Sequence, residues 1–276
     1  MDTGLMLINR TPLETYELGG CPVLVKREDL CCPPPGPSFS KARGVVGHIQ
    51  SLPMDTIGVL DTFHSKAGWA VAWACNRLGK RCVVYWPRYK ADTERVPRVQ
   101  QQNAQQLGAH LVDLPAGRSA VLYHAAKKHL AANWPGAYMM PNALKISESV
   151  EENAAEVLRT KLPPGGTLVI SISSGTIAAG IIRGLHLSHL WGKYQVIAHM
   201  GYSRSFEAAG RYMEEKSRVT LDGFVDIVDE GYAYKDEAKG KAPFPCNSHY
   251  DLKAWNWLST HIEQLKAPVV FWNIGE

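Results

Sequence analysis

The sequence predicts an α/β protein built from two open, mostly parallel α/β lobes with a cleft between them. Short apolar runs typical of buried strands alternate with helical patterns along almost the whole chain of 276 residues. This alternation is typical of right-handed β-α-β units, which place helices on both faces of a parallel sheet. The strands are also too numerous for one compact unit of about 150 residues, which favours two lobes.

The first half of the chain alternates four predicted strands with four predicted helices. Each strand is a short apolar run, and one of them is closed by Pro87, which cannot continue a ladder. The second helix carries Trp69 and Trp73, whose spacing predicts one buried face. The predicted strands are 21–26, 56–60, 81–86 and 110–113, and the predicted helices are 39–52, 65–78, 94–107 and 119–133.

The second half continues the same alternation. Ser149, followed three residues later by Glu152, predicts a helix start because this pair can satisfy the first backbone N–H groups. The segment Pro163-Pro-Gly-Gly166 then breaks the chain before an apolar strand. The predicted helices are 149–161, 176–187, 205–216 and 250–264, and the predicted strands are 167–171, 194–199 and 268–272.

The composition excludes a largely disordered chain, since 45% of the residues are hydrophobic and 20% are charged. No apolar run approaches roughly 18 residues and the first residues do not resemble a secretion signal, so we expect a cytoplasmic protein. The net charge of +4 permits an anionic ligand but does not by itself predict nucleic-acid binding.

The six cysteines form no Cys-x-x-Cys pair, and we expect all of them to be reduced. Cys246 has no base beside it and is not expected to be a nucleophile. His186 and His189 could share a ligand on a helix, but without a third ligand they favour a structural role. No metal site is therefore expected.

Lys41 stands in the segment Pro37-Ser-Phe-Ser-Lys41-Ala-Arg43-Gly44, near the start of a predicted helix. The positive field of a helix N-terminus and apolar neighbours both favour the neutral, nucleophilic amine. Such a lysine can form a Schiff base with a carbonyl cofactor. On spacing alone, a solvated surface lysine is the alternative.

The segment Ser171-Ile-Ser-Ser-Gly175-Thr176-Ile-Ala-Ala-Gly180 joins a predicted strand to a predicted helix through small residues. Backbone N–H groups and the helix dipole attract anions at such a junction, so phosphate is the expected ligand. The segment matches neither the Gly-x-Gly-x-x-Gly nor the Walker pattern, which disfavours dinucleotides and nucleoside triphosphates. A tight turn that simply needs small residues is the alternative.

A third segment, Asp61-Thr-Phe-His64-Ser65-Lys66-Ala-Gly68, follows the predicted strand 56–60. Open α/β sheets bind ligands at this kind of strand end. Ser65 could equally serve only as the N-cap of the next helix.

Taken in this order, the three segments resemble the fold-type-II, tryptophan synthase β-like enzymes that depend on pyridoxal 5'-phosphate (PLP). The nearest branch contains aminocyclopropane-carboxylate deaminase and D-cysteine desulfhydrase. The resemblance also includes Thr11-Pro-Leu, Val25-Lys26-Arg27-Glu28-Asp29-Leu30, His249-Tyr250-Asp251-Leu-Lys253 and Val270-Phe-Trp-Asn-Ile-Gly275.

The resemblance implies a residue for each group of the cofactor. Lys41 matches the Schiff-base lysine, and Asp251 would keep the pyridine nitrogen protonated, which makes the ring an electron sink. Tyr250 would pack near the ring or the substrate. The phosphate loop is matched by Ser173, Ser174, Gly175 and Thr176.

The resemblance also implies a large PLP-binding domain of residues 1–43 and 146–276, a small α/β domain of residues 44–145 inserted in it, and a homodimer. Ser65 and Lys66 match the loop for the substrate carboxylate and the cofactor hydroxyl, but Lys66 replaces the usual asparagine. Ala67 and Gly68 replace polar groups that grip an α-carboxylate. Lys66 could hold a substrate anion, act as an acid or base, or be solvated.

The implied function is a PLP-dependent lyase that cleaves a bond at the α-carbon of a small amino-acid-like substrate. Deamination, β-elimination, racemisation and decarboxylation all stay open. One alternative is a phage-type decarboxylase, in the host cytoplasm, that acts on an amino-acid-modified thymine in DNA. Another is an inactive relative that only binds a ligand, against which Lys41 and Asp251 argue. In the phage alternative the DNA backbone would meet a basic rim of Arg88, Lys90, Arg95, Arg98 and Arg204.

Overall fold

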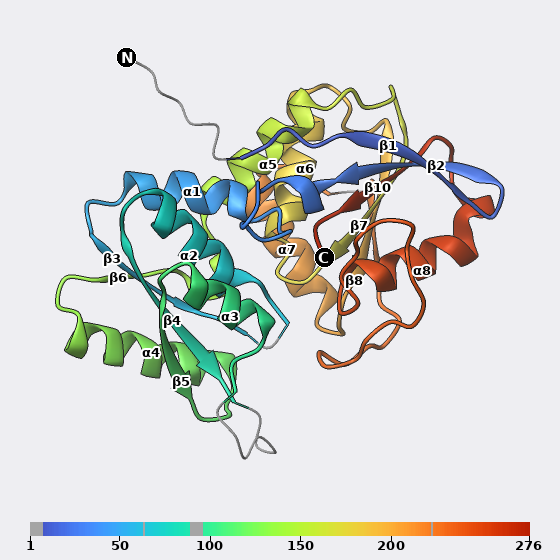
Figure 1. The fold of residues 1–276 in the computed structure, drawn as a ribbon. Coiled ribbons are helices and arrows are strands. Elements are labelled where there is room, and N and C mark those ends of the chain that lie inside the picture. Colours follow the sequence, from blue (N-terminus) through green and yellow to red (C-terminus); the bar gives the residue numbers. More distant parts are fainter. Residues whose placement is uncertain (1–7, 63, 89–95, 222) are drawn as a thin grey trace. The chain divides into compact units, whose positions relative to one another are not determined.

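The computed structural model describes residues 8–62, 64–88, 96–221 and 223–276, and Figure 1 shows their elements. The chain divides into two units, each with its own sheet. The four-stranded unit contains Cys32–Pro37 and Lys41–Glu148, and the six-stranded unit contains Asn9–Cys31, Ser38–Ser40 and Ser149–Glu276. The predicted α/β class is confirmed. The predicted domain borders after residues 43 and 145 stay a prediction.

The six-stranded sheet has the order β1-β2-β10-β7-β8-β9. Its strand pairs are parallel except for β1 with β2, which form an antiparallel hairpin. Parallel neighbours end at the same side of the sheet, which we call the carboxyl edge. The strands are β1 (Leu13–Leu18), β2 (Cys21–Arg27), β7 (Gly166–Ile172), β8 (Tyr194–Met200), β9 (Val225–Val228) and β10 (Val269–Asn273).

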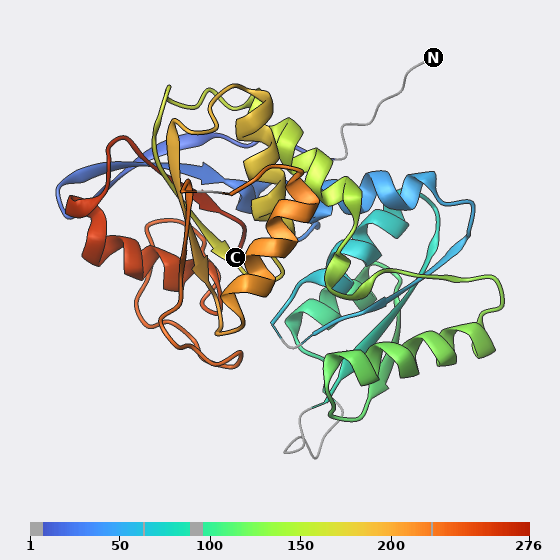
Figure 2. The same ribbon diagram turned by 180° about the vertical axis from the view of Figure 1, so that it is seen from behind.

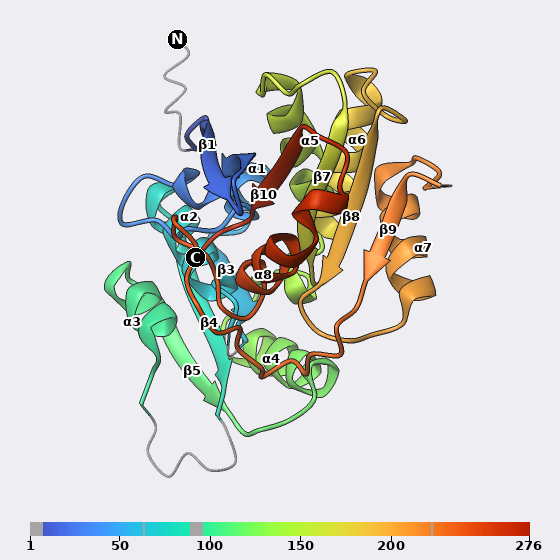
Figure 3. The same cartoon turned by 90° about the vertical axis from the view of Figure 1, so that its right-hand side faces the viewer.

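Side chains of β7 alternate between two apolar cores, as a strand buried on both faces requires. Leu168 and Ile170 pack with α5, α6 and α7, whereas Val169 packs with α8. Figure 3 shows α8 on one side of these strands, and Figure 2 shows the opposite face from behind. The helices are α5 (Ser147–Arg159), α6 (Thr176–Leu187), α7 (Phe206–Ser217) and α8 (Asp251–His261).

The four-stranded sheet has the order β5-β4-β3-β6, and its neighbouring strands pair in parallel. Helix α4 packs on one face through Leu122, Ala126 and Leu130, and α2 contacts β3 and β4. The strands are β3 (Thr56–Leu60), β4 (Arg81–Pro87), β5 (His110–Leu114) and β6 (Tyr138–Met139), and the helices are α1 (Ala42–Ser51), α2 (Ala67–Arg77), α3 (Val99–Gln106) and α4 (Ser119–Asn133).

The structure corrects several predicted elements. Ser149 does not start a helix: α5 begins at Ser147, and Ser149 is buried within its first turn. The prediction did not include β1, β6 or β9. The predicted helix 94–107 begins at Val99 in the described residues, and positions 94 and 95 lie outside them. Over the described part of the chain, no helix has the length and apolar character that a membrane span requires.

Candidate functional site

Lys41 lies at the N-cap position of α1, immediately before the helix begins, and 8% of its surface is exposed. Its Nζ donates a hydrogen bond to the carbonyl oxygen of Ala143, at 2.8 Å. Burial, together with the nearby Lys145, lowers the pKa of Lys41 to about 8. The neutral amine is therefore far more accessible near pH 7 than in a solvated lysine.

The backbone just before Lys41 is held at the carboxyl edge of the six-stranded sheet. Ser40 N–H donates to the carbonyl oxygen of Ile274, which directly follows β10, at 3.0 Å. The N–H of the same Ile274 donates to Asp251 Oδ1 at 3.2 Å. Ile274 thus connects the segment that leads into Lys41 with the carboxylate predicted to meet the pyridine nitrogen.

Asp251 is the first residue of α8 and is almost fully buried. Burial, with the nearby Asp29 carboxylate, raises the pKa of Asp251 to about 8, although its hydrogen bond from Ile274 N–H opposes the rise. Asp251 therefore carries a proton through most of the neutral range. Such a carboxyl group can donate a hydrogen bond to a ring nitrogen or transfer its proton there.

The predicted phosphate loop lies at the end of β7, as expected. Gly175 has φ of +86°, a left-handed conformation that favours glycine, and α6 begins immediately after it without a side-chain cap. The hydroxyls of Ser174 and Thr176 are 3.0 Å apart, and Tyr212 Oη lies 2.9 Å from Thr176 Oγ1. This helix start offers backbone N–H groups, hydroxyls and a positive dipole to an anion.

Tyr250 packs against the backbone at the end of β8. A Cβ on Gly201 would lie only 2.8 Å from Tyr250 Cδ1, so this close approach requires glycine. Burial and a hydrogen bond with Tyr234 raise the pKa of Tyr250 well above its usual value, so its hydroxyl stays protonated. Tyr250 thus lies at the same edge of the sheet as the phosphate loop.

In the four-stranded unit, the predicted substrate loop contains a buried carboxyl group that the prediction did not single out. Asp61 is fully buried at the end of β3 and accepts hydrogen bonds from Thr62 N–H (2.9 Å), Gln101 Nε2 (2.8 Å) and Gly68 N–H. Burial raises the pKa of Asp61 to about 7, although these hydrogen bonds oppose the rise. A Cβ on Gly68 would lie 2.8 Å from Asp61 Oδ2, so glycine is needed there.

The two predicted catalytic residues of this loop have ordinary contacts. Ser65 Oγ accepts a hydrogen bond from Ala67 N–H at 3.1 Å, which helps to start α2. Lys66 Nζ lies 5.4 Å from the centre of the Trp69 ring, a cation–π contact. Trp73 is fully buried, whereas Trp69 is only partly buried and donates to Pro35 O. The catalytic roles of Ser65 and Lys66 stay predictions.

The residues of the predicted basic rim have different surroundings. Arg88 forms an ion pair with Asp113, at 3.0 Å, and the backbone N–H of Arg98 donates to Gln101 at the start of α3. Lys90 and Arg95 lie outside the described residues. Arg204 lies against Gly175, and its Nε and Nη2 are buried. Among the described members, Arg204 is thus associated with the phosphate loop.

Comparisons with known proteins assign this arrangement to a family. The family model described as "Pyridoxal-phosphate dependent enzyme" matches residues 5–239. The chain belongs to the pyridoxal-phosphate-dependent enzymes. This PLP-dependent enzyme is also 62% identical, over 278 residues, to a protein of Pseudomonas phage M6 described as "Glycyl-dTMP PLP-dependent decarboxylase". The match covers 98% of this chain and 100% of the phage protein.

Solved structures of other PLP-dependent enzymes share the fold. An aminocyclopropane-carboxylate (ACC) deaminase homologue gives a TM-score of 0.80 at 16% identity, covering 98% of this chain and 90% of the homologue. Threonine deaminase isoform 2 of Solanum lycopersicum gives 0.68 at 16% identity, covering 98% and 84%. At these identities the likeness shows the fold alone. The predicted fold-type-II resemblance is confirmed.

The carboxyl edge fits PLP on its own chemistry. Three buried polar atoms there have no hydrogen-bond partner within the described residues: Ser40 Oγ, Ser171 Oγ and Asn273 Oδ1. In the parallel pair of β10 and β7, Trp272 lies opposite Ile170. The next residues, Asn273 and Ser171, therefore lie side by side at the carboxyl edge. Buried polar groups left without partners indicate that a polar ligand completes their hydrogen bonds.

Proposed function

We propose that this PLP-dependent enzyme decarboxylates a glycyl group carried by a thymine nucleotide. The observation that carries the proposal is the 62% identity, over essentially both whole chains, to the glycyl-dTMP decarboxylase of Pseudomonas phage M6. In the reaction, the bond between the α-carbon and the carboxylate breaks, carbon dioxide leaves, and a proton takes its place on the α-carbon. We further propose that the enzyme works in a host cytoplasm, as a homodimer, on nucleotides within DNA.

The surroundings of Asp61 favour decarboxylation over reactions that keep the carboxylate. Deamination, β-elimination and racemisation need a grip on the α-carboxylate, and the start of α2 is where the family's substrate loop would supply it. Here the Gly68 N–H already donates to Asp61, and the buried residues Ala67 and Gly68 present no polar side-chain group. A weakly held carboxylate is easier to lose, because fewer hydrogen bonds stabilise it before the reaction.

Each proposed role follows from a property of this chain. Bound PLP withdraws electrons from the α-carbon of an amine joined to it. Lys41, with its lowered pKa, would hold the cofactor covalently and then, once displaced by the substrate amine, would hold the proton that the α-carbon receives. Asp251 would supply and share a proton at the pyridine nitrogen. Tyr250 would pack beside the ring, and the phosphate would lie on Ser173, Ser174, Gly175 and Thr176.

The first test measures cofactor attachment and needs no substrate. Purified protein incubated with PLP is expected to show an absorbance band near the edge of the visible range, which borohydride removes. Lys41→Ala should lack this band, whereas Lys128→Ala, which removes an exposed lysine of α4, should keep it. A folded wild-type protein without the band would overturn the assignment of Lys41.

The second test measures the reaction. Wild-type enzyme is expected to release labelled carbon dioxide from a carboxyl-labelled glycyl-thymine substrate, supplied as a mononucleotide and within an oligonucleotide. Free glycine, serine and threonine should release neither carbon dioxide nor ammonia at a comparable rate. Turnover of a free amino acid with the glycyl substrates untouched would contradict the proposed substrate. Turnover of the mononucleotide alone would contradict DNA as the partner.

A further inference from the structure

Arg204 lies in the connection between β8 and α7, one residue before Ser205, the N-cap of α7. Its Nη2 lies 3.8 Å from the position that a Cβ on Gly175 would take. The guanidinium is therefore packed against the proposed phosphate loop, although about thirty positions of sequence separate the two segments.

Arg204 is half-buried, and two nitrogens of its guanidinium lie fully buried with no carboxylate beside them in the described residues. Its Nε and Nη2 are inaccessible to solvent and have no hydrogen-bond partner in the part of the chain that the structure describes. Burial lowers the pKa of Arg204, and the groups that oppose this are the hydroxyls of Tyr202 and Tyr212, not a carboxylate. Buried guanidinium donors left unfilled are costly, and an anion that accepts their hydrogen bonds removes this cost.

The neighbouring groups indicate what kind of anion this is. Tyr212 lies beside the same glycine as Arg204, with its Cδ1 3.3 Å from the position that a Cβ on Gly175 would take. Its hydroxyl is hydrogen-bonded with Thr176 Oγ1, which is joined in turn to Ser174 Oγ. The hydroxyls and backbone N–H groups of this loop can donate hydrogen bonds but contribute no full positive charge. A phosphate monoester carries close to two negative charges at neutral pH, and a guanidinium donates two parallel hydrogen bonds to such a group.

We propose that Arg204 is a phosphate-binding residue of this enzyme, whose guanidinium pairs with the phosphate of PLP held at residues 173–176. The inference rests on the proposed function, which places that phosphate at this loop. A nucleotide substrate also carries a phosphate, but the contact of Arg204 with Gly175 assigns the guanidinium to the cofactor.

The test compares PLP with pyridoxal, which has the same ring and aldehyde but no phosphate. Cofactor-free wild type, Arg204→Gln, Arg204→Lys and Arg211→Gln are titrated with each compound, and binding is followed by absorbance. Arg211 is the matched control because it is an exposed arginine of the same helix, α7. Circular dichroism confirms that each variant is folded.

Arg204→Gln is expected to bind PLP about 10- to 100-fold more weakly than wild type, while its affinity for pyridoxal changes less than about 3-fold. Arg204→Lys should recover part of the loss, because a lysine keeps the charge but not the paired hydrogen bonds. Arg211→Gln should match wild type with both compounds.

Three results would overturn the inference. Arg204→Gln could bind PLP like wild type, or it could lose PLP and pyridoxal equally, which would indicate a general change of the site. It could also keep PLP affinity and lose only the nucleotide substrate relative to the nucleoside, which would assign Arg204 to the substrate phosphate. Failure of the proposed function is recognised separately, by a wild-type protein that forms no borohydride-sensitive band or releases no carbon dioxide from the glycyl-thymine substrates.

Discussion

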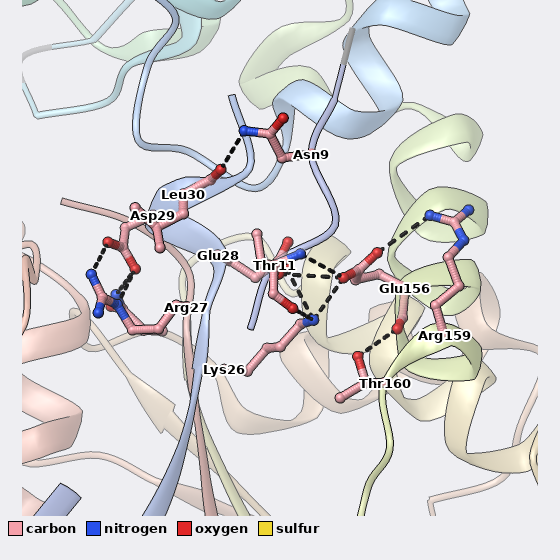
Figure 4. A network of polar contacts seen from close by, with 11 residues as sticks. Asn9, Thr11, Lys26, Arg27, Glu28, Asp29, Leu30, Glu156, Arg159 and Thr160 are labelled. Carbon is pink, nitrogen blue, oxygen red and sulfur yellow. Dashed lines mark hydrogen bonds and ion pairs between the residues drawn. The ribbon is translucent and has the colours of Figure 1, made fainter. Parts of the chain in front are cut away.

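The six-stranded unit buries two groups of polar side chains that differ in how completely they are paired. The first surrounds Lys26, and Figure 4 shows its contacts. Lys26 Nζ lies 2.6 Å from Glu156 Oε1, 2.6 Å from the Thr11 carbonyl oxygen and 4.0 Å from Glu28 Oε1. The Thr11 hydroxyl donates to Glu28, and Arg159 Nη1 lies 3.3 Å from Glu156 Oε2. Every charge of this group has an opposite charge or a hydrogen-bond partner beside it.

The second group lies at the carboxyl edge, and its members are incompletely paired. Ser171 Oγ, Asn273 Oδ1 and two guanidinium nitrogens of Arg204 have no hydrogen-bond partner among the described residues. Asp251 has a pKa raised to about 8 by burial instead of one lowered by a cation. Burial and charge alone therefore do not identify a ligand-binding site. Paired groups connect segments of the fold, whereas several unpaired groups gathered at one edge of a sheet point to a ligand.

The largest expected effect separates two buried lysines. Lys26→Met should lower the free energy of unfolding by about 3–5 kcal/mol, because it leaves the buried carboxylates without their cation. Lys41→Met should change that free energy by no more than about 1 kcal/mol, since it removes one hydrogen bond from an amine that burial already disfavours. Chemical denaturation of the cofactor-free proteins, followed by circular dichroism, measures both.

In cofactor attachment the order of the two variants should be reversed, so that Lys41→Met is the more severely affected. Lys41→Met should lose the borohydride-sensitive band completely, and any folded fraction of Lys26→Met should keep it. Equal destabilisation by the two variants would contradict the distinction between a structural and a functional lysine.

The continuity of an apolar run decides which strands the sequence could predict. Buried strands such as β7 and β8 were predicted because their apolar runs are continuous. The strands that were not predicted are short or lie at edges, as with β1 and β9, where polar residues alternate and the pattern is weak. Ser149 was misassigned because a capping pair two residues inside a helix has the same letters as one at its start.

Local motifs predicted Lys41 and the loop at residues 173–176, since a strand followed by small residues and a helix has a sequence signature. The contact of Arg204 with Gly175 has no such signature, because it depends on how the β8–α7 connection packs against the β7–α6 loop. Asp61 belongs to a segment that the sequence analysis singled out. An acidic residue directly after an apolar strand was the signal that could have identified it as a buried carboxyl group. Its hydrogen bonds with Gln101 and Gly68 are long-range or backbone contacts that spacing cannot show.

The next prediction compares two buried carboxyl groups, Asp251 and Asp61. The pKa of Asp251 rises from 3.8 to about 8 in the folded protein and that of Asp61 to about 7, so the folded chain keeps protons that the unfolded chain releases. Their stabilising contributions are therefore complete below pH 3.8 and are lost as the pH rises through about 7 and 8. Asp251→Asn and Asp61→Asn should each flatten this fall, measured by denaturation of cofactor-free protein between pH 5 and pH 9.

Cofactor binding should then separate the two variants. Asp251→Asn is expected to lower the decarboxylation rate by at least about 100-fold, because the proton at the pyridine nitrogen is lost. It should also change the pH dependence of PLP binding. Asp61→Asn should leave PLP binding unchanged, since the Asp61 carboxyl already accepts hydrogen bonds from Thr62, Gln101 and Gly68. An unchanged rate and pH profile for Asp251→Asn would exclude its role at the pyridine nitrogen.

The smallest expected effect compares two hydroxyls on one face of β7. Thr167 Oγ1 donates to Lys266 O at 2.9 Å, whereas Ser171 Oγ has no partner among the described residues. Thr167→Val should therefore lower the free energy of unfolding by about 1 kcal/mol and leave PLP affinity unchanged. Ser171→Ala should leave the cofactor-free protein as stable as wild type but weaken PLP binding by about 2- to 10-fold, because only the bound cofactor completes its hydrogen bond. Denaturation and PLP titration of both variants measure the contrast, and a Ser171→Ala protein with wild-type PLP affinity would place that hydroxyl outside the cofactor's contacts.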